Sequence, residues 1–143
     1  MPHANCALVE EIFRRARFIH SLGIELVDVG PGWCETKVLV SPSLQQQHGF
    51  VHAGVVMTLA DHTCGGAAGS IVPDGKDVLT VENKTSFLRP AAGSVLFCRA
   101  QVLRLGKSLA FVEAEVTVER DGKRVLVSKM SSTLAVIDAG RGN

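Results

Sequence analysis

Residues 45–61, QQQHGFVHAGVVMTLAD, combine backbone and side-chain groups that can act on a carbonyl carbon. Gly49 and Gly54 flank a turn that leads into an apolar stretch, and Asp61 interrupts that stretch. A helix that begins at this turn has free N–H groups at its N-terminus, where the helix dipole favours negative charge, so the turn can hold an oxyanion. A carboxylate two turns further on, on the face that carries Gly54, can attack a polarised carbonyl or activate water beside it. The arrangement suits acyl transfer.

Asp61 also has a purely structural interpretation. At about 100° per residue it lies roughly opposite Leu59 on a helix and shares a face with Met57, Thr58 and Gly65. An aspartate on such a face can be solvated or can hydrogen-bond a loop, because only some perturbed carboxylates mark functional sites. The residue types alone leave both interpretations open.

Two other pairs contain residue types that can bind a metal or act as nucleophile and base, but neither pair has the geometry that such a role needs. His48 and His52 have the spacing of a helical metal pair, but Gly49 and the turn argue against a helix there, and no third ligand is evident. His62 and Cys64 are two residues apart, so on a helix they point to different faces and cannot form a nucleophile and base. We therefore expect no metal site and no cysteine nucleophile.

Length and composition predict one soluble domain spanning residues 1–143. The chain is 46% apolar and 20% charged, and no stretch approaches the ~18 consecutive apolar residues of a membrane span. The net charge is +1 with dispersed basic residues, so neither nucleic acid nor a membrane is an expected partner. Glu10, Glu11 and Arg14 stand where a signal peptide needs its apolar segment, so the expected location is the cytoplasm. The four cysteines contain no C-x-x-C pair and are expected to be free, mostly buried thiols.

Hydrophobic spacing predicts the elements that must position Asp61. Residues 5–20 have apolar positions three and four apart, which predicts an amphipathic helix that ends before Gly23. Residues 24–29 and 33–40 flank a Gly-Pro-Gly turn, which predicts a hairpin. Residues 53–70 have helical spacing but contain three glycines among other small residues. Each glycine makes the helix roughly 1 kcal/mol less stable than alanine would. Such a helix needs neighbours that pack very close to it.

The second half of the chain supplies those neighbours. It contains four β-rich runs separated by turn residues: 78–88, 95–105, 109–119 and 124–136. In the third run Ala110, Val112 and Ala114 share one face while Glu113 and Glu115 take the other, so the apolar face is buried. The order of elements predicts an α+β domain in which an antiparallel sheet curls around a central helix at about 53–70, with a further helix at the N-terminus.

A family resemblance appears in the spaced residues before Asp61. Gln46-x-x-Gly49-x-x-His52-Ala53-Gly54-x-x-x-x-Leu59-Ala60-Asp61 resembles the N-x-x-G-x-x-H-G-G-x-x-x-x-L-A-D signature of the PaaI-like (phenylacetic acid degradation-related) hotdog-fold acyl-CoA thioesterases. VLTVENKTSFLRPAAG (78–93) and RLGKSLAFVEAEV (104–116) are similar to the family's later strands, so the likeness covers about residues 40–137. The chain departs from the signature at Gln46, which keeps the amide chemistry of Asn, and at Ala53, which keeps a backbone donor. These departures bear on the acyl specificity and on the position of the water.

The resemblance implies a homo-oligomer, a dimer or a tetramer built from dimers, with each active site between two subunits. It implies hydrolysis of an acyl-CoA thioester, with an aromatic or medium-chain acyl group, without metal or cofactor. The implied catalytic roles are nucleophile or general base for Asp61, oxyanion donor for the Gly54 N–H, a second group at the carbonyl for His52, an orienting amide for Gln46 and a supporting hydrogen-bond donor for Thr80.

The same resemblance implies a set of substrate- and CoA-binding residues: Gly49, Val51, Ala53, Val81, Arg89 and Lys107. Arg89 and Lys107 would meet the CoA phosphates, but both can also be solvated charges at strand ends. Two alternatives remain beside the thioesterase. One is a hotdog hydratase or dehydratase, which the L-A-D context of Asp61 disfavours, and the other is an acyl-CoA-binding module without turnover.

Overall fold

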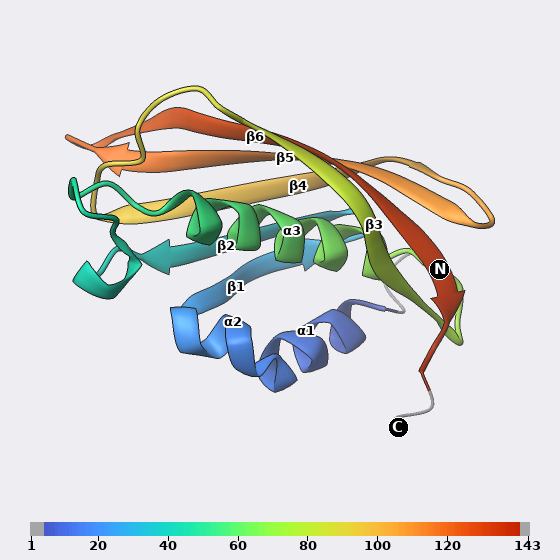
Figure 1. The fold of residues 1–143 in the computed structure, drawn as a ribbon. Coiled ribbons are helices and arrows are strands. Elements are labelled where there is room, and N and C mark those ends of the chain that lie inside the picture. Colours follow the sequence, from blue (N-terminus) through green and yellow to red (C-terminus); the bar gives the residue numbers. More distant parts are fainter. Residues whose placement is uncertain (1–4, 141–143) are drawn as a thin grey trace.

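The computed structural model describes residues 5–140 of the 143-residue chain. A six-stranded antiparallel sheet, in the order β1-β2-β4-β5-β6-β3, curls around the long helix α3 (Figure 1). The elements are α1 (Cys6–Arg15), α2 (Arg17–Leu22), β1 (Ile24–Gly30), β2 (Trp33–Leu39), the 3₁₀ turn η1 (Pro42–Leu44), α3 (Ala53–Gly69), β3 (Lys76–Phe87), β4 (Val95–Leu105), β5 (Leu109–Arg120) and β6 (Lys123–Asp138). This arrangement confirms the predicted α+β hotdog architecture, and the strands differ from the predicted ranges only near their ends.

The N-terminal segment differs from the prediction, because it forms two helices rather than one. Ala16 has an extended backbone, with φ −76° and ψ 91°, and separates α1 from α2. The apolar spacing continues across the break, so Val9 and Phe13 of α1 and Ile19 of α2 are all buried. Gly23 ends α2 in the left-handed conformation that glycine adopts at little cost. None of the helices in residues 5–140 has the length and apolarity to cross a bilayer.

The face of the sheet that meets α3 follows the predicted alternation. On β5 the side chains of Ala110, Val112, Ala114, Val116 and Val118 are buried, and the residues between them face outward. Burial of this stripe against Leu59 and Ala60 of α3 forms the hydrophobic core. All six strands of the sheet contact α3, and burial of their apolar side chains against the helix holds it in place.

Among the strands within residues 5–140, β3 lies at one edge of the sheet and pairs with β6 alone. The register of this pairing shifts between Thr80 and Glu82, which is a β-bulge. Leu79 and Val81 on this strand are 63% and 62% exposed. A long edge strand with exposed apolar side chains is unusual for a chain that works alone, because its free N–H and C=O groups can pair with another strand.

Close packing explains one of the glycines in α3 but not its neighbour. A Cβ atom on Gly66 would lie 2.8 Å from Sγ of Cys34 and 3.3 Å from the ring of Phe13. A Cβ atom on Gly65 would meet nothing within 4 Å. The expectation that close neighbours account for the glycine-rich helix thus holds at Gly66, whereas Gly65 borders open space.

These two glycines give a matched test of packing against helix propensity. We expect Gly66→Ala to lower the free energy of unfolding by about 1–3 kcal/mol, because the strain of overpacking outweighs the gain in helix propensity. The control Gly65→Ala should raise the free energy of unfolding by up to about 1 kcal/mol. Urea denaturation followed by circular dichroism measures both variants, and equal shifts of the same sign would contradict the packing assigned to Gly66.

Candidate active site

Asp61 is half-buried in the third turn of α3 and faces the edge strand β3. Its Oδ1 atom accepts a hydrogen bond of 2.8 Å from Oγ1 of Thr80 and one of 3.2 Å from Nδ2 of Asn83. Two donors from one strand fix the orientation of the carboxylate. The structure thus brings together Asp61 and Thr80, and adds Asn83, which the sequence did not single out.

The β-bulge explains why Asn83 was missed. Thr80 and Asn83 are three residues apart, and in a regular strand residues at odd spacing point to opposite faces. The extra residue between Thr80 and Glu82 shifts the alternation by one, so both side chains reach Asp61. No residue in VENK signals a bulge, so the sequence carries no clear warning of this contact.

The start of α3 is a second cluster of candidate residues. His52 is the N-cap of the helix, and its Nδ1 atom accepts a hydrogen bond of 2.8 Å from the Gly54 amide. Oε1 of Gln46 accepts from the amides of His48, at 2.5 Å, and Phe50, at 3.4 Å, and so closes the turn that contains Gly49. Gly49 has φ +83°, which favours glycine. The Gly54 amide and the Gln46 carbonyl are therefore already engaged within this subunit.

An open hollow of about 600 Å³ adjoins this second cluster. Gln46, His52, Ala53, Phe87 and Arg89 are among the residues that line it. Val51 also lines the hollow, although its side chain is buried in the core and its amide donates to the carbonyl of Ala91.

The two clusters are too far apart to act together within one subunit. Asp61 is the seventh residue after Gly54 on the same helix, which corresponds to a rise of about 10 Å. A thioester carbonyl is much shorter than this separation. The Asp61 carboxylate and the amides at the start of its own α3 therefore cannot contact the same carbonyl group.

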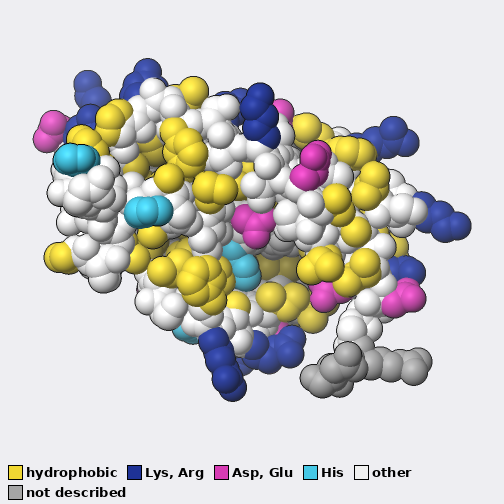
Figure 2. All heavy atoms as spheres, viewed as in Figure 1, with side chains coloured by type: hydrophobic (Ala, Val, Ile, Leu, Met, Phe, Trp, Pro, Cys, Tyr) yellow, Lys and Arg dark blue, Asp and Glu magenta, His cyan; other side chains and the backbone are white. Residues whose placement is uncertain are grey.

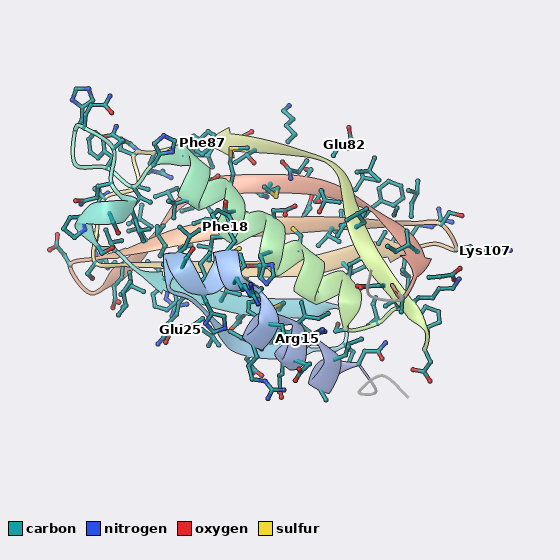
Figure 3. All side chains as sticks on the ribbon, turned by 60° about the horizontal axis from the view of Figure 1, so that its bottom comes forward. Arg15, Phe18, Glu25, Glu82, Phe87 and Lys107 are labelled. Carbon is teal, nitrogen blue, oxygen red and sulfur yellow. The ribbon has the colours of Figure 1, made fainter. Side chains whose placement is uncertain are left out.

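The remaining candidate residues are spread over the subunit. Val81 is exposed on β3, and Nη1 of Arg89 donates a 2.8 Å hydrogen bond to the carbonyl of Leu126. Lys107 lies in the β4–β5 turn, at the opposite end of the molecule from Phe87, which stands two residues before Arg89 (Figure 3). One subunit thus does not bring Arg89 and Lys107 together.

Figure 2 shows a histidine and an acidic side chain near the middle of a face on which many hydrophobic side chains are exposed. His62 directly follows Asp61 on α3 and is half-buried. The His62 ring packs edge-on against Phe13, with centroids 4.3 Å apart, and its Nε2 atom is buried without a hydrogen-bond partner in residues 5–140. Burial lowers the pKa of His62 below its ordinary value, while the nearby Asp61 carboxylate acts in the opposite direction. The imidazole is therefore neutral near pH 7.

The lowered pKa of His62 makes a testable contribution to stability. Below about pH 6.5 the unfolded chain protonates this histidine while the native protein does not, so the unfolded state binds more protons. We expect the free energy of unfolding to fall as the pH drops from about 7.5 to about 5.5, and His62→Phe to remove part of that slope. Urea titrations at several pH values measure it, and identical slopes for the two proteins would contradict the assignment.

The other groups considered for chemistry have structural roles. No three His, Cys, Asp or Glu side chains within residues 5–140 converge as a metal site would require. His48 lies in a turn and His52 caps α3, so they are not a helical pair. The four cysteines are free, as predicted; burial raises the pKa of Cys34 and Cys64 far above the ordinary value and that of Cys98 to about 12. Such buried thiols are poor nucleophiles.

The curled sheet and the central helix define a hotdog fold. The chain belongs to the thioesterase superfamily, whose pattern matches residues 48–125. It is 32% identical to the 1,4-dihydroxy-2-naphthoyl-CoA hydrolase of Listeria monocytogenes over 117 residues, which are 81% of this chain and 92% of that protein.

Solved structures agree with this assignment. A thioesterase family protein from Silicibacter pomeroyi superposes with a TM-score of 0.89 at 37% identity, covering 92% of this chain and 96% of that one. The PaaI protein of E. coli, from the phenylacetic acid degradation operon, superposes with a TM-score of 0.82 at 20% identity over 98% and 97% of the two chains. At that identity the likeness to PaaI concerns the fold alone.

Proposed function

We propose that this protein hydrolyses acyl-CoA thioesters and that Asp61 is its nucleophile or general base. The observation that carries the proposal is the Asp61 carboxylate, held by Thr80 and Asn83 and open to hollows on the protein surface. A carboxylate fixed in this way is preorganised for attack or proton abstraction. The relative from Listeria is an acyl-CoA hydrolase, and this similarity supports a CoA thioester as the substrate. The free thiols fit a reducing compartment such as the cytoplasm.

Either role of Asp61 completes the hydrolysis. As a nucleophile, a carboxylate oxygen adds to the thioester carbonyl, the tetrahedral oxyanion collapses with loss of the CoA thiolate, and water then hydrolyses the mixed anhydride. As a general base, Asp61 takes a proton from water as that water adds to the carbonyl, and the proton later passes to the departing thiolate. Both routes need donors at the oxyanion, and these stabilise the transition state more than the substrate.

The oxyanion donors in this proposal come from the partner subunit. Since Asp61 cannot share a carbonyl with the start of its own helix, the second subunit must place the start of its α3 beside Asp61. There the Ala53 amide is the first N–H of the helix, and the Gly54 amide becomes available when the His52 ring turns away. Gln46 and His52 then lie at the carbonyl, as the sequence resemblance implies.

The edge strand β3 is the proposed contact between the two subunits. Pairing β3 with its copy would satisfy the free backbone groups of the edge, cover Leu79 and Val81, and bring Asp61, which β3 contacts, to the interface. Exposed apolar side chains on the outer sheet face, among them Leu103 and Phe111, suit the packing of two such dimers into a tetramer. In such an assembly one CoA molecule can contact both Arg89 and Lys107 only if the two residues belong to different subunits.

The role of Asp61 is tested with Asp61→Asn. This change keeps the shape of the side chain but removes the charge, so we expect kcat for acyl-CoA hydrolysis to fall by a factor on the order of 10² or more. KM and the thermal midpoint should change little. Release of free thiol in single-turnover experiments measures the rate, and Asp28→Asn, an exposed aspartate on β1, is the matched control. A stable, oligomeric Asp61→Asn variant with near-normal kcat would refute the mechanism.

The two-subunit site is tested by complementation. Asp61→Asn and Gln46→Ala should each be nearly inactive, but mixing and refolding them together should restore roughly a quarter of the wild-type activity, because half of the random dimers are mixed and each contains one intact site. Sedimentation confirms that the mixed species form. If Asp61 and Gln46 acted within one subunit, the mixture would recover no activity.

A further inference from the structure

The edge strand β3 presents every second residue to its free side. Oγ of Ser128 on β6 donates a 3.0 Å hydrogen bond to the carbonyl of Ser86, so the backbone groups of Ser86 face β6. Successive residues of a strand direct their N–H and C=O groups to opposite sides. The backbone groups of Asn83, Thr85 and Phe87 therefore face the free edge and can pair with another strand.

Two of these residues mark the two ends of the proposed site. Nδ2 of Asn83 donates to Asp61, and Phe87 lines the hollow at Ala53, where α3 begins. Figure 3 shows Phe87 beside the start of α3. Four strand residues span about 13 Å, close to the rise of about 10 Å from Gly54 to Asp61 along the helix. A position on β3 therefore identifies the part of α3 that lies beside it.

Two-fold symmetry allows few registers for β3 and its copy. An axis perpendicular to the sheet keeps each side chain on its own face, and residues that lie directly opposite in an antiparallel pair share a face. The axis must therefore pass through a residue rather than between two. The proposed site needs Asp61 at the start of the partner's α3, which requires Asn83 opposite the partner subunit's Phe87. Only an axis through Thr85 gives this pairing.

The neighbouring registers each create a conflict. An axis through Lys84 would place two ammonium groups directly opposite each other, which destabilises a strand pair. An axis through Asn83 would bring together the two Asp61 carboxylates that the two Asn83 side chains contact. An axis through Ser86 would place Asn83 opposite the partner's Arg89, and the Arg89 amide already donates to β6 within its own subunit.

The side chain of Thr85 supports an axis at this residue. Its Oγ1 atom is buried without a hydrogen-bond partner in residues 5–140, and a buried hydroxyl left unpaired is costly. An axis through Thr85 brings the two threonine Cβ atoms to roughly 5 Å, where threonine pairs hydrogen-bond across strands. On the outer face Lys84 then lies opposite the partner's Ser86, so like charges do not meet. This register gives the hydroxyl a partner that residues 5–140 of one subunit do not supply.

We infer that β3 pairs with a second copy of the chain in the register centred on Thr85, which brings the partner subunit's Phe87 to the Asp61 site. The inference rests on the proposed thioesterase function and defines the subunit contact of that site. The partner's Phe87 ring covers Asn83 on the side that faces α3 and shields its hydrogen bond to Asp61 from water. The register therefore adds a residue of the partner to the surroundings of the carboxylate.

Disulfide cross-linking tests the register. Lys84 and Ser86 are exposed, and in this register each lies opposite the other residue of the partner subunit. They form a pair without mutual backbone hydrogen bonds, about 4.5 Å apart at Cα, which suits a disulfide. We expect mild oxidation of co-refolded Lys84→Cys and Ser86→Cys chains to form covalent dimers at least tenfold faster than oxidation of either variant alone. Both variants carry Cys6→Ser, because Cys6 is only half-buried. Non-reducing electrophoresis measures the rate.

The alternative registers give different patterns. Rapid cross-linking of Lys84→Cys alone would place the axis at residue 84, and rapid cross-linking of Ser86→Cys alone would place it at residue 86. Either pattern would overturn the inference, as would a mixture that forms no covalent dimer. Lys123→Cys, at an exposed position at the start of β6, is the matched control and should not cross-link to Ser86→Cys.

Activity separates this inference from the proposed function. The disulfide lies on the outer face of the sheet, so cross-linked dimers should hydrolyse a panel of acyl-CoAs, from acetyl-CoA to benzoyl-CoA, as fast as the reduced protein. Loss of hydrolysis on cross-linking, restored by dithiothreitol, would overturn the inference, because the linked register would not be the active one. If the expected cross-link forms but the wild-type protein hydrolyses none of the panel, the thioesterase proposal fails and the register stands. Hydrolysis with another register would overturn this inference alone.

Discussion

The contact between Asp61 and the edge strand is the constraint on which the rest of the site depends. A carboxylate in the middle of a buried helix needs partners, and here a strand at the rim of the sheet supplies two of them through Thr80 and Asn83. Asp61 reaches these partners because the strand that carries them, β3, lies at the border of the sheet. The border is also where another chain can approach, so one contact ties the chemistry of the carboxylate to the assembly of the protein.

The glycines of α3 lie in two opposite environments on one helix. On the side of Gly66 the helix comes close to β2 and α1, and a side chain would collide with Cys34. On the side of Gly65 the helix borders open space, and a Cβ atom would meet nothing within 4 Å. Close packing therefore accounts for the first glycine and not for the second. Buried apolar contacts elsewhere, such as those of Leu59 and Ala67, compensate for the poor helix propensity.

Periodicity and turn residues predicted most of the fold, because these signals are local. The alternation in β5 and the turn signals at Gly30 and Asp121 each depend on a few adjacent residues. The family resemblance predicted Asp61, Thr80 and the start of α3 as site residues. The sequence did not predict the break at Ala16, the bulge after Thr80 or the cavity beside His62, because each arises from how distant segments fit together. The distance between Asp61 and Gly54 follows from helix geometry alone. The proposal that two subunits share the site also required the position of β3 at the edge of the sheet.

The bulge in β3 has a consequence for how this site could change in evolution. Loss of the single extra residue, Val81, would leave Asn83 two residues after Thr80, and regular alternation would keep both side chains on the face toward α3. The residues from Glu82 to Phe87 would also keep their faces and their pairing with β6. One codon deleted at the bulge would thus straighten the edge strand and leave the surroundings of Asp61 in place, so the bulge itself can be lost or gained without rebuilding the site.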